Sequence, residues 1–455
     1  MTHYHFIAIG GAGMSGIARI LLELGNEVSG SDIKVSEATR RLVALGAKVH
    51  IGHSAEHVPA NCDTVVVSSA IHEDNPEVVE ARRRGLNIVH RADMLAMLMA
   101  RGKGIAIAGA HGKTTTTSMI AMALEKAGAD PTILIGGEVT DFGGNARLGS
   151  GDIVVAEADE SDGSFLKLEP YLAVVTNIDD DHLDYYENIE NVKEAFRAFL
   201  DKVQPDGTVV YCSSDPATCE VVRDTAVRRL AYGLSGDAYI TARDITKREW
   251  GSEFVVVAGD KVLGAVSLKV PGTHNVENAL AAICVGWVLG FEFKALSEGL
   301  AGFGGAQRRL QHVGEQAGVL VLDDYAHHPT EVKASLRAIR EHVEGRVICV
   351  YQPHRYSRTL ALKEEFGTAF ESCDILLLAP IYPGPGEKRM PDVDSSVIAI
   401  EVTQKTGKSA SYFDSPETLV ENAILLAEPG DAIVTMGAGD VYRLGPIILD
   451  RLSTT

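Results

Sequence analysis

The sequence predicts an α/β protein of three domains: a Rossmann-like N-terminal domain, a central domain with a mostly parallel sheet, and a C-terminal Rossmann-like α/β domain. Short apolar runs alternate with helical patterns along the chain, as parallel strands joined by crossover helices require. Glycine-rich turns follow two of these runs, at residues 11–16 and 109–112. At 455 residues the chain is also too long for one ordinary core, since domains usually hold about 100–200 residues.

The N-terminal domain is expected to cover residues 1–101. Met14 to Leu24 has the apolar spacing of a helix and is followed by Gly25, a typical helix stop. Buried strands are expected before and after this helix, at residues 6–9, 27–30, 65–67 and 87–89.

The central domain is expected to cover residues 102–307. Apolar runs predict buried strands at 104–108, 153–156, 173–176 and 209–211. Helical patterns follow over 115–127 and 274–289. Between residues 239 and 268 the pattern changes to short alternating strands, for which antiparallel pairing is one option.

The C-terminal domain is expected to cover residues 308–455. It follows a glycine-rich segment, residues 302–307, that is typical of a linker. Four further strands with helices between them are expected at 319–322, 347–350, 375–378 and 432–435.

Composition argues against several classes of protein. Acidic residues outnumber basic ones by 62 to 42, a net charge of −20, whereas a nucleic-acid-binding protein needs a basic face. An anionic substrate would need local positive charge, from a few Lys or Arg side chains or from helix N-termini. The six cysteines form no CxxC pair and indicate reduced packing residues. No leader pattern and no apolar run of 18 residues is found, so we expect a cytoplasmic protein without a membrane contact.

Residues 109–115, Gly-Ala-His-Gly-Lys-Thr-Thr, indicate a loop that binds ATP phosphates. They lie between a buried strand and a helix, where backbone amides and the helix dipole face phosphate oxygens. Lys113 suits the terminal phosphates and the Thr114 hydroxyl suits Mg²⁺. The spacing is shorter than the usual pattern, whose first glycine would fall at Ile107. We expect a central P-loop ATPase domain whose nucleotide contacts are Gly109, Ala110, His111, Gly112, Lys113, Thr114 and Thr115.

A second glycine-rich turn, Gly11 to Gly16, follows a strand and opens a helix. It matches the dinucleotide fingerprint, with acidic Asp32 at the end of the next strand. A pyrophosphate is therefore expected at the helix N-terminus, from NAD or from a UDP-sugar; a tight turn without a ligand is the alternative. The residues expected to contact substrate here are Gly11, Ala12, Gly13, Met14, Ser15 and Asp32.

Acidic segments follow two strands of the central domain, at residues 157–162 and 177–184. The carboxyl ends of parallel strands meet at one edge of a sheet, where ligands bind. Carboxylates and a neutral imidazole at that edge can hold Mg²⁺ near phosphates. We expect Glu157 and His182 as metal ligands and interpret most of the other acids as solvated loop charges.

Two polar clusters follow strands of the C-terminal domain, at residues 323–329 and 352–358. The first contains His327 and His328, and the second contains His354 and Arg355. Histidines and arginines gathered at strand ends suit an anionic ligand. We favour such a ligand over a structural role, and over a zinc site because no cysteine accompanies the histidines.

In this order the motifs resemble the Mur ligase family of bacterial cell-wall synthesis. The resemblance spans the whole chain and implies an N-terminal domain for a UDP-sugar, a central ATPase and a C-terminal domain for an amino acid. Within the family the chain is most similar to the branch that joins L-alanine to UDP-N-acetylmuramate. The segments that carry the resemblance are 9–18, 28–32, 109–117, 157–165, 176–177, 181–182, 274–275, 324–332 and 352–359.

For that branch the resemblance implies that ATP and Mg²⁺ convert the lactyl carboxylate to an acyl phosphate, which the amine of L-alanine attacks. It implies that Lys113, Glu157 and His182 are catalytic. Metal contacts are implied for Thr114, Glu157 and His182, and further nucleotide contacts for Asn275, Arg308 (or its neighbour Arg309) and Asp324. Substrate contacts are also implied for Ser69, Ser161, His327, His354 and Arg355.

Other functions stay open at this point. A related Mur-type ligase could add a tripeptide to the same UDP-sugar. An NAD-dependent oxidoreductase would explain only Gly11 to Gly16, and a regulator could use ATP as a switch. In every case the expected partners are small molecules, and the chain is expected to be a monomer or a homodimer.

Overall fold

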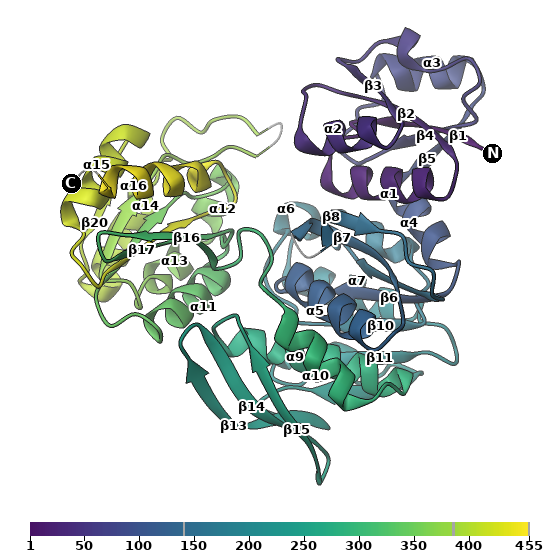
Figure 1. Cartoon of the computed structure of the whole chain (residues 1–455). Coiled ribbons are helices and arrows are strands. Elements are labelled where there is room, and N and C mark those ends of the chain that lie inside the picture. Colours follow the sequence, from purple (N-terminus) through teal and green to yellow (C-terminus); the bar gives the residue numbers. More distant parts are fainter. Residues whose placement is uncertain (140–141, 385–386, 454–455) are drawn as a thin grey trace. The chain divides into compact units, whose positions relative to one another are not determined.

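A computed structural model describes residues 1–139, 142–384 and 387–453 of the chain (Figure 1). The described residues contain three sheets, of five, ten and six strands, and this confirms the three-part α/β prediction. They form two compact units, one of residues 1–245, 254–267 and 277–303 and the other of residues 246–253, 268–276 and 304–455. The N-terminal sheet and most of the central sheet belong to the first unit, while residues 246–253, which include parts of β13 (Ile240–Arg248) and β14 (Gly251–Ala258), belong to the second. The boundaries expected at 101/102 and 307/308 stay predictions.

The N-terminal sheet is parallel throughout, with the order β3-β2-β1-β4-β5. The strand order reverses between β1 and β4, and such a reversal opens a crevice for ligands at the carboxyl ends of the strands. Its elements in chain order are β1 (His3–Ile7), α1 (Ala12–Glu23), β2 (Glu27–Asp32), α2 (Glu37–Ala44), β3 (Lys48–Ile51), β4 (Thr64–Val67), α3 (Pro76–Arg83), β5 (Asn87–His90) and α4 (Arg91–Met99).

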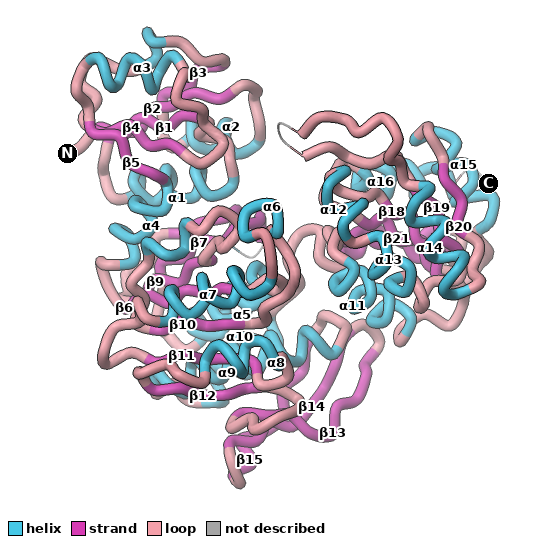
Figure 2. Tube along the Cα trace, turned by 180° about the vertical axis from the view of Figure 1, so that it is seen from behind, coloured by secondary structure: helices cyan, strands magenta, loops and turns pink. Residues whose placement is uncertain are grey.

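Helices cover both faces of this sheet, with α3 on one face and α1 and α2 on the other (Figure 2). Successive strand residues point to opposite faces, so Ile7 packs with Val78 of α3, whereas Phe6 packs with Ile17 of α1. The predicted strand at 6–9 was wrong in its position. The strand ends at Ile7 because Ala8 has a φ of 62° and accepts a hydrogen bond from the amide of Gly11 in a turn.

A buried carboxylate, Glu77, ties α3 to the two central strands. Its Oε2 lies 2.6 Å from His5 Nε2 and accepts a hydrogen bond from the Ser31 hydroxyl at 2.9 Å, while Oε1 lies 2.9 Å from His53 Nδ1. Burial acts to raise the pKa of Glu77, but these three hydrogen bonds lower it below 4.5, so the carboxylate is ionised. The network fixes the carboxyl end of β2, where Asp32 lies.

The central sheet has the order β15-β14-β13-β12-β11-β10-β6-β9-β7-β8. In the described part of the chain, the strands from β13 through β12, β11, β10, β6 and β9 to β7 pair in parallel. Strand β8 pairs with β7 in the antiparallel direction. The strands are β6 (Lys103–Ala108), β7 (Thr132–Val139), β8 (Gly144–Arg147), β9 (Ile153–Glu157), β10 (Leu172–Val175), β11 (Thr208–Cys212), β12 (Arg228–Tyr232), β13 (Ile240–Arg248), β14 (Gly251–Ala258) and β15 (Lys261–Leu268).

Helices join the strands of the central sheet. They are α5 (Lys113–Lys126), α6 (Leu183–Tyr186), α7 (Ile189–Leu200), α8 (Pro216–Val222), α9 (Thr273–Leu289) and α10 (Phe293–Gly302). The strands and helices predicted between residues 104 and 289 are thus confirmed in kind, including the three strands between residues 239 and 268. The glycine-rich segment after Gly302 has no regular structure until β16, as a linker requires.

The C-terminal sheet has the order β16-β17-β21-β18-β19-β20, parallel except for β16 at one edge. Its strands are β16 (Gln311–Gln316), β17 (Val319–Asp324), β18 (Val347–Tyr351), β19 (Ile375–Leu378), β20 (Ala410–Tyr412) and β21 (Ala432–Met436). Its helices are α11 (Pro329–Arg340), α12 (Tyr356–Ala361), α13 (Lys363–Ala369), α14 (Ser396–Thr406), α15 (Pro416–Leu426) and α16 (Leu444–Leu452). Among the described residues, no helix has the length and apolar character needed to cross a bilayer.

We expect Glu77→Ala to destabilise the N-terminal domain by about 3–5 kcal/mol, because His5 and Ser31 would lose a buried partner. Thermal unfolding followed by calorimetry measures the loss as a lower Tm. Glu73→Gln is the matched control, since that side chain is 81% exposed, and should change stability by less than about 0.5 kcal/mol. Equal Tm values for the two variants would contradict the role of Glu77.

Candidate active site

The loop between β6 and α5 has the geometry expected of a phosphate-binding loop. Gly109 and Gly112 have φ values of 139° and 80°, which residues with a Cβ rarely adopt. A Cβ on Gly109 would also lie 2.0 Å from Thr176 Oγ1. Both glycines are therefore required by the backbone, and the predicted strand–turn–helix arrangement is confirmed.

The end of β10 holds this loop in place. The Thr176 hydroxyl donates to the carbonyl of His111 at 2.7 Å, and the His111 amide donates to Asn177 Oδ1 at 2.8 Å. The His111 ring lies 2.9 Å from Asp179 through Nε2. The loop is thus fixed by side chains of the neighbouring strand, which is the preorganisation that phosphate binding needs.

Lys113 opens α5 and forms a buried ion pair with Glu160. Its ammonium donates to Glu160 Oε1 at 2.6 Å and to the carbonyl of Gly109 at 2.5 Å, and the Glu160 side chain is only 3% exposed. Burial acts to lower the pKa of Lys113, but the carboxylates of Glu160, Asp159 and Glu157 raise it, so the side chain is a cation. Burial raises the pKa of Glu160, and the Lys113 charge opposes that rise.

Two predicted metal ligands, Thr114 and Glu157, approach adjacent residues of β7. A Cβ on Gly137 would lie 3.3 Å from Thr114 Cγ2, and one on Gly136 would lie 2.3 Å from Glu157 Oε2. Glu157 ends β9 in register with Ile107 of β6, just before the loop. Thr114 thus lies next to β7 through its methyl group and Glu157 through its carboxylate. Hydroxyl and carboxylate oxygens are the donors that Mg²⁺ prefers.

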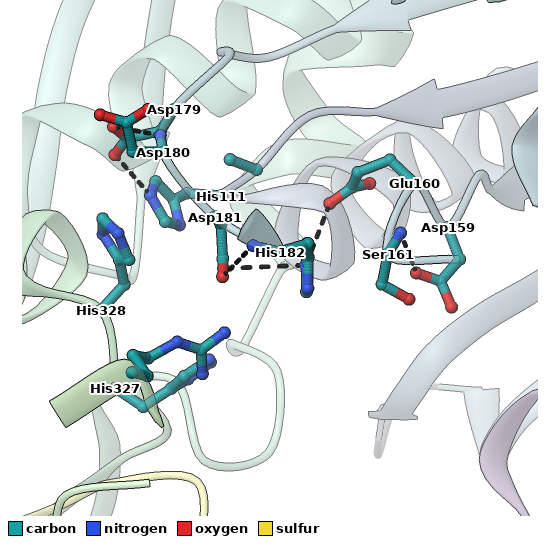
Figure 3. Close-up of polar contacts among 12 residues, drawn as sticks. His111, Asp159, Glu160, Ser161, Asp179, Asp180, Asp181, His182, His327 and His328 are labelled. Carbon is teal, nitrogen blue, oxygen red and sulfur yellow. Dashed lines mark hydrogen bonds and ion pairs between the residues drawn. The ribbon is translucent and has the colours of Figure 1, made fainter. Parts of the chain in front are cut away.

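The third predicted ligand, His182, lies beside Glu160. Its Nε2 is 3.7 Å from Glu160 Oε1 and 3.7 Å from Asp181 Oδ2 (Figure 3). Oε2 of Glu160 is buried and has no hydrogen-bond partner among the described residues. An unsatisfied carboxylate oxygen beside an imidazole fits a cation site. Glu160 was not among the metal ligands predicted from the sequence, which were Thr114, Glu157 and His182.

The same acidic turn faces the N-terminal domain through Asp159. Arg91 Nη2 lies 2.7 Å from Asp159 Oδ2, and the Ser161 amide donates to Asp159 Oδ1 at 3.1 Å. Burial acts to raise the pKa of Asp159, but Arg91, the Ser161 hydrogen bond and Lys113 lower it to about 2. Ser69, a predicted substrate contact, donates to Asp162 of this turn.

The second glycine-rich turn precedes α1 at the strand-order reversal of the N-terminal sheet. Asp32 is buried and accepts a hydrogen bond from the amide of Gly10 at 2.8 Å. Its carboxylate therefore stabilises the backbone of the turn. Asn145, in β8, donates to Ser15 Oγ at 3.1 Å and to the carbonyl of Ala12. Asn145 was not predicted, because a lone asparagine in a glycine-rich segment carries no pattern.

In the C-terminal unit, Asp324 ends β17 and is fully engaged with the backbone. Its two carboxylate oxygens accept the amides of Leu310 and Ala326, each at 2.7 Å, and burial raises its pKa to about 6. The two candidate arginines differ in their contacts. Arg308 Nε donates to Asp323 at 3.1 Å, whereas Arg309 donates to Glu331 at 3.2 Å.

Asn275 and His274 begin α9 and belong to the same unit. Asn275 donates to the carbonyl of Pro271 at 2.7 Å. Burial, with the nearby Arg309 charge, lowers the pKa of His274 to about 4, so the imidazole is neutral. The nucleotide contact expected of Asn275 stays a prediction.

The predicted amino-acid residues come together at the carboxyl ends of β17 and β18. The rings of His327 and His354 lie 5.7 Å apart, and Arg358 Nη1 is 3.4 Å from His354 Nδ1. Arg355 has a φ of 66° and donates its amide to the carbonyl of Tyr382 at 2.8 Å. Imidazole and guanidinium groups gathered here suit a carboxylate ligand.

Comparison with known proteins matches three family models along the chain. They are "Mur ligase family, catalytic domain" over residues 3–103, "Mur ligase middle domain" over 107–286 and "Mur ligase, glutamate ligase domain" over 308–439. The UDP-N-acetylmuramate–L-alanine ligase of Pelotomaculum thermopropionicum is 50% identical over 99% of this chain and 97% of its own. That of Geobacter sp. strain M21 is 49% identical over 98% and 97%.

Solved structures give the same result. The crystal structure of UDP-N-acetylmuramate-alanine ligase from Thermotoga maritima matches with a TM-score of 0.83 and 28% identity, over 100% of both chains. A murein peptide ligase from Psychrobacter arcticus matches with a TM-score of 0.72 and 24% identity, over 100% of this chain and 99% of that one, and supports the fold alone.

We expect Gly109→Ala to weaken ADP binding at least about 10-fold, because the new Cβ would collide with Thr176 and strain the loop. Isothermal titration with ADP measures the effect. Gly304→Ala is the control, since nothing lies within 4 Å of its Cβ position and its φ is not positive, and it should bind ADP as the unchanged chain does. Full ADP affinity in Gly109→Ala would rule out the loop as the phosphate site.

Proposed function

The chain belongs to the Mur ligase family, and from that premise we propose that it is the ATP-dependent ligase that joins UDP-N-acetylmuramate to L-alanine in peptidoglycan precursor synthesis. The observation that carries the proposal is the pairing of Lys113 with the acidic turn beside the phosphate loop. Identity of 50% over 99% of the chain with a ligase of that name supports the choice of substrates.

The chemistry explains why an ATP site is needed. A carboxylate is a poor electrophile, since expelling oxide from it is prohibitive. Transfer of the γ-phosphoryl group of ATP to the lactyl carboxylate forms an acyl phosphate and releases ADP. The amine of L-alanine then attacks the acyl carbon, and the tetrahedral intermediate collapses to the amide, expelling phosphate, while the amine loses a proton.

Lys113 is the cation proposed to neutralise charge during phosphoryl transfer. Two anions must approach each other in that step, and a fixed ammonium at the start of α5 lowers the electrostatic barrier. Glu160 holds the ammonium at the phosphate loop before nucleotide binds. Thr114, Glu157 and His182 would hold Mg²⁺, which when bound would neutralise further phosphate charge, and the unsatisfied Oε2 of Glu160 fits a cation there.

Other residues are proposed to bind and orient the substrates. The turn from Gly11 to Ser15 would hold the pyrophosphate of the UDP-sugar at the N-terminus of α1. Arg355 would bind the carboxylate of L-alanine bidentately, with His354 and His327 beside it. Asn275, Arg308 and Asp324 are proposed to contact the nucleotide. The protein is proposed to be cytoplasmic and to be a monomer or a homodimer.

We expect phosphate release from ATP to depend on UDP-N-acetylmuramate, Mg²⁺ and L-alanine together. Coupled phosphate detection with each component omitted in turn measures this dependence. Release with a tripeptide but not with L-alanine would instead identify a ligase that recycles peptides onto the same UDP-sugar. Turnover of NADH would contradict both assignments.

We expect Lys113→Ala to lower kcat at least about 1,000-fold, because the transferred phosphoryl group loses its fixed cation. Lys126→Ala is a matched control on the same helix, since that side chain is 55% exposed at the far end of α5, and it should retain full activity. Rates of amide formation compared at saturating substrates measure the difference. Comparable kcat values for the two variants would remove Lys113 from the chemical step.

A further inference from the structure

Arg91 lies against the first turn of α1, although it comes from another part of the N-terminal domain. It is the first residue of α4, directly after β5, and α4 packs against α1 in both views (Figures 1 and 2). A Cβ on Gly13 would lie 3.1 Å from Arg91 Nη1 and 3.8 Å from its Cδ. The guanidinium therefore lies beside the turn whose amides face the expected pyrophosphate.

The guanidinium is paired with the acidic turn after β9. Nη2 lies 2.7 Å from Asp159 Oδ2 and 3.6 Å from Asp162 Oδ2. Ser69 donates to the same Asp162 and lies 3.1 Å from His90 Nε2. The Arg91 side chain is 21% exposed and that of Asp159 39% exposed, so ligands in solvent can reach the pair.

Charge explains why an anionic ligand needs this side chain. The chain carries a net charge of −20, so an incoming pyrophosphate meets a repulsive field unless a local cation offsets it. A helix N-terminus supplies only about half an elementary charge. A guanidinium adds a full positive charge and two parallel N–H donors. It can bind two oxygens of a phosphate bidentately, as it binds the two oxygens of a carboxylate.

We propose that Arg91 binds the pyrophosphate of the UDP-sugar and leaves Asp159 when that substrate enters. The inference rests on the proposed function, because it takes the UDP-sugar from there. The exchange swaps one charge-assisted pair for another: the guanidinium keeps an anionic partner, and the released Asp159 carboxylate is hydrated at the surface and retains the amide of Ser161.

Binding of UDP-N-acetylmuramate, and of UDP alone, to the full chain tests the assignment by isothermal titration. We expect Arg91→Gln to bind both about 10- to 100-fold more weakly, and Arg91→Lys to recover part of the loss. Affinity for ADP should stay unchanged in both variants. Arg83→Ala is the control, since that arginine of the same domain is 70% exposed and pairs with Glu80 on α3.

Asp159→Asn separates ligand binding from a purely structural role. If Arg91 exchanges partners, removing the competing carboxylate should tighten UDP binding several-fold in the otherwise unchanged chain and clearly less in the Arg91→Gln background. A merely structural Arg91 would give no such coupling and would lower Tm and ADP affinity together.

Unaltered UDP affinity in Arg91→Gln, or equal effects of Asp159→Asn in both backgrounds, would overturn the inference. If the unchanged chain binds UDP and its binding depends on Arg91, but the chain forms no amide with L-alanine, the inference stands and the proposed function fails.

Discussion

A buried ammonium must be paired, and the pairing of Lys113 with Glu160 is the constraint on which the site depends. Desolvating a lone ammonium is costly, and a carboxylate at 2.6 Å offsets that cost. To supply it, the acidic turn after β9 must lie over the phosphate loop, which requires β9 and β6 to be adjacent and parallel. The order of strands in the central sheet is thus tied to one ion pair at its carboxyl edge.

Neighbouring residues of that turn serve two different sites. Glu160 faces the phosphate loop through Lys113, whereas Asp159 faces the N-terminal domain through Arg91. Asp159 also contributes to the raised pKa of Lys113, so the two contacts are electrostatically linked. One short turn therefore connects the place proposed for the UDP-sugar with the place proposed for ATP, without any long chain of contacts between them.

Much of this arrangement could be predicted from sequence because it rests on local patterns. Buried parallel strands are continuous apolar runs in the sequence. The turn from Gly109 to Gly112 needs positive φ values at both ends, and glycines occupy those two positions. The edge strand β3 was missed because Lys48 and His50 leave it exposed, without an apolar run. Glu160 was missed because the sequence does not show which carboxylate of residues 157–162 contacts Lys113. That choice depends on the turn at Gly163, whose φ is 68°, and on packing between elements.

Four cations at or near the proposed anion sites are already paired with carboxylates of the protein. Lys113 pairs with Glu160 and Arg91 with Asp159 in one unit, while in the other Arg308 pairs with Asp323 and Arg309 with Glu331. In a chain with 20 more acids than bases, an unpaired cation would find a carboxylate in any case. Binding an anion therefore means exchanging partners, and its free energy is the difference between two charge-assisted pairs. A ligand gains from that exchange only if it offers more than a carboxylate does: two phosphates in place of one carboxylate, or a geometry that engages several donors at once. At Arg91 the proposed pyrophosphate meets this condition, because it offers two phosphates in place of the single Asp159 carboxylate.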